Sequence, residues 1–485
     1  MLWWRGSVRR VRHVKYPDRQ TANGWRAYVK ILVLGGGQVG ASVVENLASE
    51  ANDITVIDLD AAPLKLLQDR LDIQTLVGNA AHPSVLQAAG AADCDMLLAL
   101  TRDDETNLVA CKIASSLFNV PTKIARVRSA DYVEHGDGHT LEQFGVDTTL
   151  CPEQIVTDNL YRLFTCPGAL QVVEFANGRA QLVAVRAHTG GELVGKTLDT
   201  IADDIPDAEC RISAVYRGDR LIIPDGKTVL DSGDEVFFVA ATPHVPAILR
   251  ALRASETPIK RVMIAGGGNI GFRLASRLET DFEVKVIEKR RERCEWLTER
   301  LGSTLVLHGE GTDEELLEQE YIDEMDMFCA LTNDDEDNIM SALLAKRMGA
   351  RRVIALVNRL SYADLLQGDR IDVVLSPHLS TIGSLLAYIR RGDIEAVHPL
   401  RRGKVEALEA IVHGDRKTSR LVGRMIQDVD LPQGCYISAI VRDERVMMAH
   451  HDQVVESGDH LIVFVARRRQ VRKVEQLFEV KLGFF

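Results

Sequence analysis

Long apolar runs are missing from this chain of 485 residues. No stretch approaches the roughly 18 consecutive apolar residues that a membrane-spanning helix needs, and this excludes a membrane span. The N-terminus also lacks an apolar run followed by a small-residue cleavage site. The sequence therefore does not predict a secretory signal.

Cysteine is sparse and scattered, and aromatic residues make up only 5% of the chain. The eight cysteines form no C-x-x-C pair, and none lies within a few residues of a histidine. Zinc sites and disulfide frameworks show such clustering, so the sequence predicts neither, and a reducing compartment fits. The body of the chain is instead aliphatic, which is typical of buried parallel sheets.

Acidic residues outnumber basic ones outside the first 28 residues. The formal net charge is −12, of which residues 1–28 carry +6 and the rest of the chain carries −18. A body this acidic is a poor binder of nucleic acid. We expect residues 1–28 to form a disordered basic extension, and the alternative is an anchor at a membrane surface.

An internal duplication is the dominant feature that the sequence does contain. Residues 30–40 (KILVLGGGQVG) recur as residues 261–271 (RVMIAGGGNIG), and residues 99–107 (ALTRDDETN) recur as residues 330–338 (ALTNDDEDN). Both offsets are 231 residues. The chain is therefore two tandem copies of a unit of about 230 residues.

Each copy divides into two domains of different character. Short apolar runs alternate with helical patterns in the first domain, which predicts βαβ units and a parallel sheet. Turn signals separate five strands in the second domain, which predicts a small α+β fold. In the first copy the predicted strands are 31–34, 54–57, 75–77, 96–100 and 123–125, then 172–175, 181–186, 211–216, 220–223 and 235–240, with helices at 197–202 and 245–253.

The predicted fold class is therefore α/β, with two tandem Rossmann-like parallel-sheet domains, each followed by a small α+β domain. The parallel-sheet domains are expected at residues 29–151 and 260–376. The small domains are expected at residues 165–255 and 395–480.

A glycine-rich turn follows the first strand of the first copy. In Gly35-x-Gly37-x-x-Gly40 the first glycine permits the turn, the second admits a pyrophosphate, and the third lets helix and strand pack closely. The helix N-terminus then offers N–H groups to phosphate. Asp58 closes the second strand, where an acid binds ribose hydroxyls and repels a 2′-phosphate. The pattern favours NAD(H) over NADP(H), although ADP or ATP would satisfy the same residues.

The second copy repeats this fingerprint with one change of acid. Gly266, Gly268 and Gly271 stand at the glycine positions, and Glu288 takes the place of the aspartate. Glutamate is longer but still reaches ribose hydroxyls. In both copies the alternative is a glycine turn that serves only the fold.

Polar residues follow the fourth strand of the first copy. Thr101 lies directly at the strand end, and we expect it to contact the ligand. Asp103, Asp104 and Glu105 are expected to cap the following helix, because acids in a first turn interact favourably with the helix dipole.

Other strand ends give less decisive signals. Arg126, at the end of the fifth strand, is interpreted as either a phosphate ligand or a partner in a salt bridge. Asn79 and Ala80, after the third strand, either border the adenosine or form an ordinary loop.

Catalytic machinery is not evident in the sequence. We find no nucleophile elbow, no phosphate-binding P-loop and no metal constellation, and the histidines of the small domains do not occupy matching positions in the two copies. A dehydrogenase would also need a substrate domain. We therefore expect a protein that is not an enzyme, and an NAD-dependent oxidoreductase is the alternative.

The repeated motifs resemble a known family. Tandem glycine-rich units, each with Ala-Leu-Thr-x-Asp-Asp-Glu-x-Asn and with a trailing domain that holds Leu-Val-Gly-[Lys/Arg] and Ser-Gly-Asp, are similar to duplicated RCK domains (KTN plus RCK_C). The resemblance covers roughly residues 29–480. It implies a regulator peripheral to the cytoplasmic face of the inner membrane, which binds NAD(H) and in some members ATP or ADP. It also implies a ring of eight RCK units from four chains, beneath a membrane potassium-translocating subunit of the TrkH/TrkG type.

The resemblance further implies which residues contact the nucleotide. The family's Gly-Asp-Ala after the third strand is Gly-Asn-Ala in one copy and Gly-Glu-Gly in the other, so the sequence departs from the pattern there. The implied contacts of the first copy are Gly35, Gly36, Gly37, Gln38, Val39, Gly40, Asp58, Asn79, Ala80, Thr101, Arg102 and Arg126. Those of the second copy are Gly267, Gly268, Asn269, Ile270, Gly271, Glu288, Glu310 and Thr332.

Overall fold

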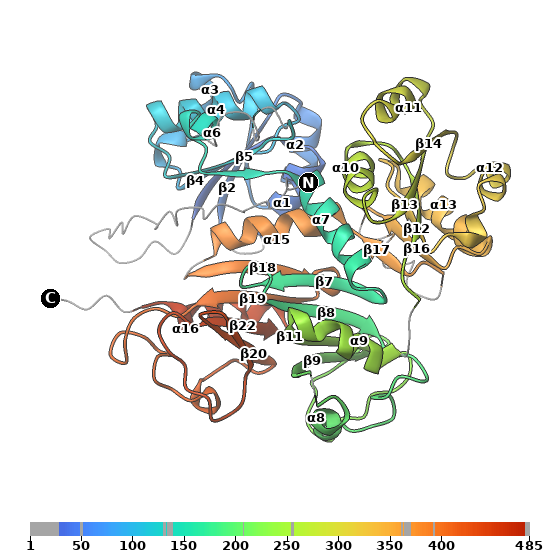
Figure 1. The fold of residues 1–485 in the computed structure, drawn as a ribbon. Coiled ribbons are helices and arrows are strands. Elements are labelled where there is room, and N and C mark those ends of the chain that lie inside the picture. Colours follow the sequence, from blue (N-terminus) through green and yellow to red (C-terminus); the bar gives the residue numbers. More distant parts are fainter. Residues whose placement is uncertain are drawn as a thin grey trace. The chain divides into compact units, whose positions relative to one another are not determined.

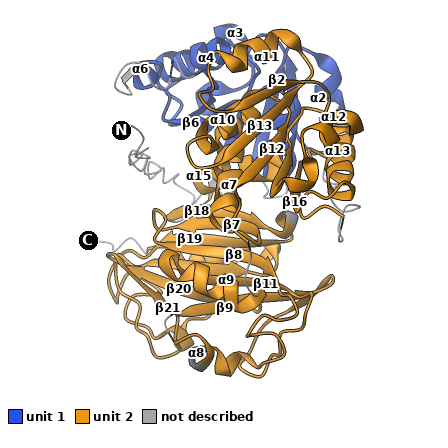
Figure 2. Cartoon of the chain, turned by 45° about the vertical axis from the view of Figure 1, so that its right-hand side comes forward, with its two compact units in different colours: residues 1–152 blue, residues 153–485 orange. Residues whose placement is uncertain are grey.

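The described chain separates into two compact units, Met1–Pro152 and Glu153–Phe485 (Figures 1 and 2). The structure is a computed structural model. It describes residues 29–48, 52–129, 132, 139–206, 208–253, 257–359, 362, 370–390 and 393–480. The expected basic extension, residues 1–28, lies outside them.

The first unit is built on a parallel sheet of six strands in the order β3-β2-β1-β4-β5-β6. This order belongs to the Rossmann fold, in which ligands bind where the strand order reverses, at the carboxyl ends of the strands. The central strands β1 and β4 are apolar and almost wholly buried, as expected of a sheet covered on both faces. The strands are β1 (Lys30–Leu34), β2 (Asp53–Asp58), β3 (Gln74–Val77), β4 (Met96–Ala99), β5 (Thr122–Arg126) and β6 (Thr148–Leu150).

Helices connect the parallel strands of this first unit. The longest, α4, begins at an N-cap aspartate, Asp103, whose carboxylate accepts a hydrogen bond from the backbone N–H of Thr106. The helices are α1 (Gln38–Ala48), α2 (Ala61–Gln68), α3 (Pro83–Ala88), α4 (Asp104–Leu117) and α6 (His139–Gln143).

The second unit contains a parallel sheet of the same design, in the order β14-β13-β12-β15-β16-β17. Its strands are β12 (Arg261–Ala265), β13 (Glu283–Glu288), β14 (Leu305–His308), β15 (Met327–Ala330), β16 (Arg352–Leu356) and β17 (Val373–Leu375). Its helices are α10 (Asn269–Leu278), α11 (Arg291–Thr298), α12 (Glu314–Gln319) and α13 (Asp335–Arg347). The duplication seen in the sequence is therefore a duplication of topology.

Two antiparallel sheets of five strands complete the second unit, in the orders β10-β9-β11-β8-β7 and β18-β19-β22-β20-β21. Their strands are β7 (Ala169–Phe175), β8 (Ala180–Arg186), β9 (Cys210–Arg217), β10 (Arg220–Ile222), β11 (Glu235–Ala241), β18 (Ile394–Leu400), β19 (Val405–Ile411), β20 (Cys435–Arg442), β21 (Arg445–Met448) and β22 (His460–Val465). The helices that accompany them are α8 (Ile201–Asp204), α9 (Val245–Arg253) and α16 (Val471–Phe478). The fold class predicted from the sequence is confirmed.

The two antiparallel sheets share one hydrophobic core. Phe175 and Phe237 of the first sheet and Phe464 of the second belong to the same cluster of buried side chains. At equivalent positions of the two copies, the hydroxyls of Ser213 and Ser438 are 3.0 Å apart and fully buried. The small domains therefore pack on each other through the same face.

Two helices that the sequence did not predict, α7 (Pro152–Thr165) and α15 (Pro377–Ile389), follow the two parallel sheets. In the second unit α7 packs against α10: Arg277 pairs with Asp158 at 2.5 Å and lies over the ring of Tyr161. Phe164 at the end of α7 meets Phe282 edge to face. A helix that follows the first parallel sheet in the chain thus packs on the second.

Most strands match the prediction to within one to three residues, but the short helix expected at residues 197–202 differs. A single 3-10 turn, Leu198–Thr200, precedes α8 and the two together form the segment. Thr197 instead bridges to Val229, because the chain there is extended. The other short 3-10 helices are Ala91–Asp93, Thr242–His244, Ile322–Glu324, Arg401–Gly403, Ile426–Asp428 and Arg468–Gln470.

The stability of the second unit is predicted to depend on pH through the partly buried His398 of β18. Its ring meets Phe175 edge to face, and burial lowers its pKa from 6.5 to about 4, with the charge of Arg162 next in effect. Between pH 6.5 and 4 the unfolded chain binds a proton that the folded chain does not, so stability falls as the pH falls. At pH 5 this linkage costs about 2 kcal/mol.

Urea unfolding of the native chain and of His398→Gln, at pH 7.5 and pH 5.0, measures this effect. Gln cannot titrate but still offers a donor to the carbonyl of Glu174, which the histidine ring nitrogen meets at 3.2 Å. We expect the variant to lose less stability between the two pH values. Equal losses in both chains would contradict the assignment.

Candidate nucleotide-binding sites

The glycine turn of the first unit is sterically determined at both ends. Gly35 has a φ of +103°, and a Cβ there would lie 3.0 Å from the carbonyl oxygen of Leu100. A Cβ at Gly40 would lie 1.8 Å from the carbonyl oxygen of Gly35, which no side chain tolerates. Gly37 has nothing within 4 Å of its Cβ position. The turn is thus closed at its outer glycines and open at the middle one, where a pyrophosphate would approach.

The second unit reproduces this turn. Gly266 has a φ of +109°, and a Cβ at Gly271 would lie 1.9 Å from the carbonyl oxygen of Gly266. Gly268, the N-cap of α10, has open space around its Cβ position. The steric roles expected of the first and third glycines are confirmed in both copies.

An acidic side chain faces each glycine turn. The Asp58 carboxylate accepts hydrogen bonds from the backbone N–H groups of Gly36 at 2.5 Å and Asp60 at 2.9 Å. The Glu288 carboxylate accepts from Gly267 N–H at 3.0 Å and from Arg290 N–H at 2.9 Å. The extra methylene of Glu288 therefore leaves the arrangement unchanged, although Glu288 is only 7% exposed.

A buried asparagine joins the neighbouring strand ends, and sequence reasoning did not assign it. The Asn107 side-chain oxygen accepts from the N–H (3.0 Å) and hydroxyl (2.7 Å) of Thr101. Its NH₂ group donates to the carbonyl of Arg126 at 2.9 Å and to that of Thr101 at 3.2 Å. Asn107 is fully buried, so these bonds tie the carboxyl ends of β4 and β5 together away from water.

Asn338 makes the same four contacts in the second unit. It accepts from the N–H and hydroxyl of Thr332, both at 2.8 Å, and donates to the carbonyls of Thr332 and Leu356. The only signal in the sequence was that this asparagine ends the motif in both copies. The threonine hydroxyl, expected to contact ligand, is already bonded within the protein in each copy.

The acids after Thr101 correct one expectation. Asp103 caps α4 as predicted. Asp104 does not cap: it is buried and accepts from the backbone N–H groups of Arg128 at 2.7 Å and Ser129 at 2.8 Å. Glu105 lies in the first turn of α4, as does Asp104, and its carboxylate accepts from the hydroxyl of Tyr132 at 3.0 Å. One acid suffices to cap the helix, and the side chains of Asp104 and Glu105 instead accept hydrogen bonds from the segment after β5.

The remaining predicted residues lie at the same carboxyl edges. Gln38 and Val39 begin α1, and Asn269 and Ile270 begin α10. Ala80 is buried, whereas Arg102 and Glu310 are exposed. Asn79 accepts from the N–H of Ala81, and Arg126 is the last residue of β5. That these residues contact a nucleotide stays a prediction.

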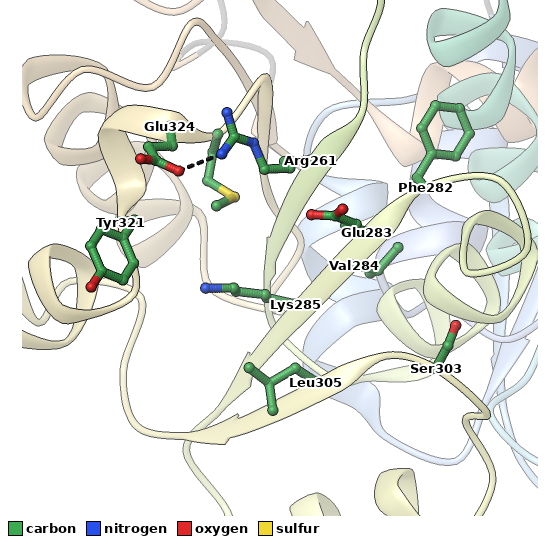
Figure 3. Close-up of a pocket in the computed structure, with 10 residues that line it drawn as sticks. Arg261, Phe282, Glu283, Val284, Lys285, Ser303, Leu305, Tyr321 and Glu324 are labelled. Atoms are coloured by element: carbon green, nitrogen blue, oxygen red, sulfur yellow. Dashed lines mark hydrogen bonds and ion pairs between the residues drawn. The ribbon is translucent and has the colours of Figure 1, made fainter.

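A pocket of about 410 Å³ lies elsewhere, at the amino ends of β12, β13 and β14 (Figure 3). Arg261 on its wall pairs with Glu324, and Lys285 pairs with Glu320 at 2.8 Å. Its cations thus already have carboxylate partners. The glycine turn of this unit follows the carboxyl end of β12, opposite to the pocket, so we do not place the nucleotide in this pocket.

The described residues offer neither an activated thiol among Cys94, Cys111 and Cys210 nor a cluster of metal ligands. Burial raises the pKa of Cys94, Cys111 and Cys210 to about 12, so these thiols stay protonated at neutral pH. Among the described residues, no group of three or more His, Cys, Asp or Glu side chains could hold a metal ion.

Comparison with known proteins matches both copies. The TrkA-N domain model matches residues 31–152 and 262–377, and the TrkA-C domain model matches residues 182–253 and 416–479. The chain is 53% identical over 457 residues to the Trk system potassium uptake protein TrkA of Halomonas elongata, covering 94% of this chain and 100% of the relative. It is 48% identical over 454 residues to TrkA of Vibrio alginolyticus, covering 93% and 99%.

A solved structure shares the fold. The GsuK channel bound to NAD superimposes with a TM-score of 0.60 over 97% of this chain and 82% of that chain. The sequences are 19% identical, so this likeness supports the fold alone.

Removing the buried amide should destabilise the first unit. Asn107→Ala leaves the partly buried N–H of Thr101 and carbonyl of Arg126 without their partner, which should cost about 2–4 kcal/mol of unfolding free energy. Asn107→Asp should be no better, because a carboxylate cannot donate to the two carbonyls. Thermal unfolding measures both effects.

The matched control is Asn52→Ala in the same unit. Among the described residues the Asn52 side chain donates one hydrogen bond, to the carbonyl of Leu47, and its replacement should cost at most about 1 kcal/mol of unfolding free energy. If Asn107→Ala lowers the unfolding temperature no more than Asn52→Ala does, the hydrogen bonds of Asn107 do not stabilise the strand ends.

Proposed function

The chain belongs to the TrkA family of Trk-system potassium uptake proteins, and we propose that it is the nucleotide-binding regulatory subunit of such a system. In this proposal it binds NAD(H) and gates a membrane potassium-translocating subunit by changing conformation. The observation that carries it is that both parallel-sheet domains hold an open glycine turn faced by a carboxylate. The potassium link comes from the family and its relatives.

The residues of the first unit fit NAD(H). The carbonyl of Gly37 accepts the first hydrogen bond of α1, from Ala41 N–H at 2.8 Å, so the free N–H groups of this helix begin at the turn. A pyrophosphate over Gly37 would meet those groups and the positive end of the helix dipole. Asp58, held by two backbone N–H groups, would accept from the ribose hydroxyls.

The same residues accept other adenine nucleotides. ADP and ATP share with NAD(H) the adenosine and the diphosphate that the turn and the carboxylate recognise. We therefore propose NAD(H) as the ligand and ATP or ADP as competitors at the same turn. GsuK, a channel that shares this fold, has been solved bound to NAD.

The proposed partners and place in the cell follow from the family. Among the described residues, no helix is long and apolar enough to cross a membrane. We place the chain on the cytoplasmic face of the inner membrane, beneath a TrkH/TrkG-type subunit, as four chains that form a ring of eight RCK units. Within each chain we keep the division 29–151, 165–255, 260–376 and 395–480.

Gating requires that the nucleotide binds two conformations with different affinity. Coupling free energies of about 1–3 kcal/mol change a population ratio about 5–150-fold. In the second unit α7 packs against α10, and Leu160 of α7 shares a hydrophobic cluster with Val183 of the small-domain strand β8. A ligand that alters the glycine turn before α10 would therefore act on α7, which contacts both α10 and the small domain.

An equilibrium titration of the purified chain with NADH tests the proposal. One or two sites per chain, with NADH recovered unoxidised, support a sensor. Absence of binding by any adenine nucleotide contradicts it. Steady oxidation of NADH with an added metabolite would favour the alternative oxidoreductase.

A charge placed at the middle glycine should abolish binding without loss of fold. Gly37→Asp meets nothing within 4 Å and provides a favourable N-cap, but its carboxylate occupies the place of the pyrophosphate. We expect NADH affinity at this site to fall more than tenfold, as measured by titration of the native chain and the variant. Gly268→Asp should do the same at the second site.

The neutral variants Gly37→Asn and Gly268→Asn are matched controls for size. They cap the helix equally and should bind more tightly than the aspartates. If aspartate and asparagine behave alike, charge at the turn does not control binding. Unchanged affinity in both would place the nucleotide elsewhere.

A further inference from the structure

The two glycine turns are faced by loops of opposite charge. After the strand that ends in Asp58, residues 58–63 (DLDAAP) contain two acids and no base. After the strand that ends in Glu288, residues 288–293 (EKRRER) contain four bases and two acids. In a Rossmann fold this loop lies beside the adenosine ribose. The duplication therefore conserved the turn and changed its electrostatic surroundings.

Arg290 places a cation directly on the acid of the second site. Its guanidinium Nε lies 3.3 Å from one carboxylate oxygen of Glu288, and its backbone N–H donates to the same oxygen at 2.9 Å. Gly267 N–H engages the other oxygen. The Glu288 charge is thus buried and compensated, while the Arg290 side chain remains 67% exposed. A ligand at this ribose position meets a cation.

Arg293 brings a second cation to the turn itself. Its Nε donates to the carbonyl of Gly267 at 2.8 Å, and its guanidinium stacks on the ring of Trp296 at 3.8 Å. Burial lowers the pKa of this guanidinium, and repulsion from Arg290 lowers it next. Two like charges are therefore held together beside one glycine turn, a costly arrangement that an anion would relieve.

The first site has no such cations at the corresponding positions. Asp60 stands for Arg290 and is the N-cap of α2, where its side chain accepts from Ala62 N–H. Pro63 stands for Arg293. Leu66 stands for Trp296 and is 67% exposed. A phosphate on the ribose would there meet the carboxylates of Asp58 and Asp60.

We propose that the second site selects an adenine nucleotide that carries a further phosphate on its adenosine ribose, whereas the first site selects one with free ribose hydroxyls. NADP(H) has this chemistry at the 2′ position, and 3′-phosphorylated adenosines have it at the neighbouring position. The inference rests on the proposed function and assigns different nucleotides to its two sites. Arg290 and Arg293 are the residues that determine the selection.

Charge and geometry both favour this assignment. A ribose phosphate adds up to two negative charges, and arginine binds phosphate through paired N–H donors. Glu310, exposed after β14, adds one acid to the second site and does not reverse the excess of bases. Lys289 adds a further base, and its carbonyl lies 3.1 Å from the ring of His308 on β14.

The test uses the full chain with one site disabled at a time. Gly37→Asp leaves the second site, and Gly268→Asp leaves the first. Fluorescence titrations of each with NADH and NADPH give the affinity ratio at one site. We expect the first site to favour NADH at least tenfold and the second to favour NADPH at least tenfold.

Exchange of the selecting residue should reverse the preference. In the Gly37→Asp chain, Arg290→Asp introduces the residue that the first copy already uses as an N-cap, and it should lower the NADPH-to-NADH affinity ratio at least tenfold. Arg291→Asp is the control: it makes the same change of charge on a side chain that is 83% exposed and paired with Glu295. It should change the ratio no more than threefold.

Competition separates the two phosphate positions. Adenosine 2′,5′-bisphosphate and adenosine 3′,5′-bisphosphate are titrated against NADPH at the second site, and displacement by either supports the proposal and identifies the position. If neither compound displaces NADPH, or if the second site favours NADH, the proposed selectivity is wrong. Binding of NADH at the first site would still support the proposed function. If neither single-site chain binds any nucleotide, the proposed function itself fails.

Discussion

The close approach of the third glycine to the first controls the geometry of both sites. The carbonyl oxygen of Gly35 lies where a Cβ of residue 40 would be, and Gly266 and Gly271 repeat the arrangement. Only a glycine lets α1 and α10 start this near to the strand that precedes them. Their N-terminal N–H groups therefore gather at the carboxyl edge of each sheet, where the fold offers a ligand its crevice.

The other polar groups of each site depend on this placement. The carboxylates of Asp58 and Glu288 reach the backbone N–H groups of Gly36 and Gly267 because β2 and β13 lie beside β1 and β12 in register. Asn107 and Asn338 hold the far side, where they join the next two strands through four hydrogen bonds each. Each site is thus a rigid frame whose variable part is the loop after the acid.

Duplication within one chain allows the copies to diverge without loss of their mutual packing. The small domains meet through equivalent serines and a shared aromatic core, yet the surrounding charges differ. Arg401 of the second copy stacks on Tyr216, whereas the matching position of the first copy is Ala176, whose N–H is bound by Glu409. Two separate but identical chains could not hold such differences, because every substitution would appear at both positions.

The sequence by itself determined the repeat, most of the strands, the two glycine turns and the acid opposite each. These follow from local periodicity and from steric rules that act within a few residues. Tertiary structure alone decided that Asn107 is bonded to Arg126, that Asp104 binds the chain after β5 rather than capping a helix, and that α7 packs on α10. These contacts join residues between 19 and about 120 positions apart. A polar side chain can bond to several chemically equivalent partners, and only the packed fold brings one of them within hydrogen-bonding distance.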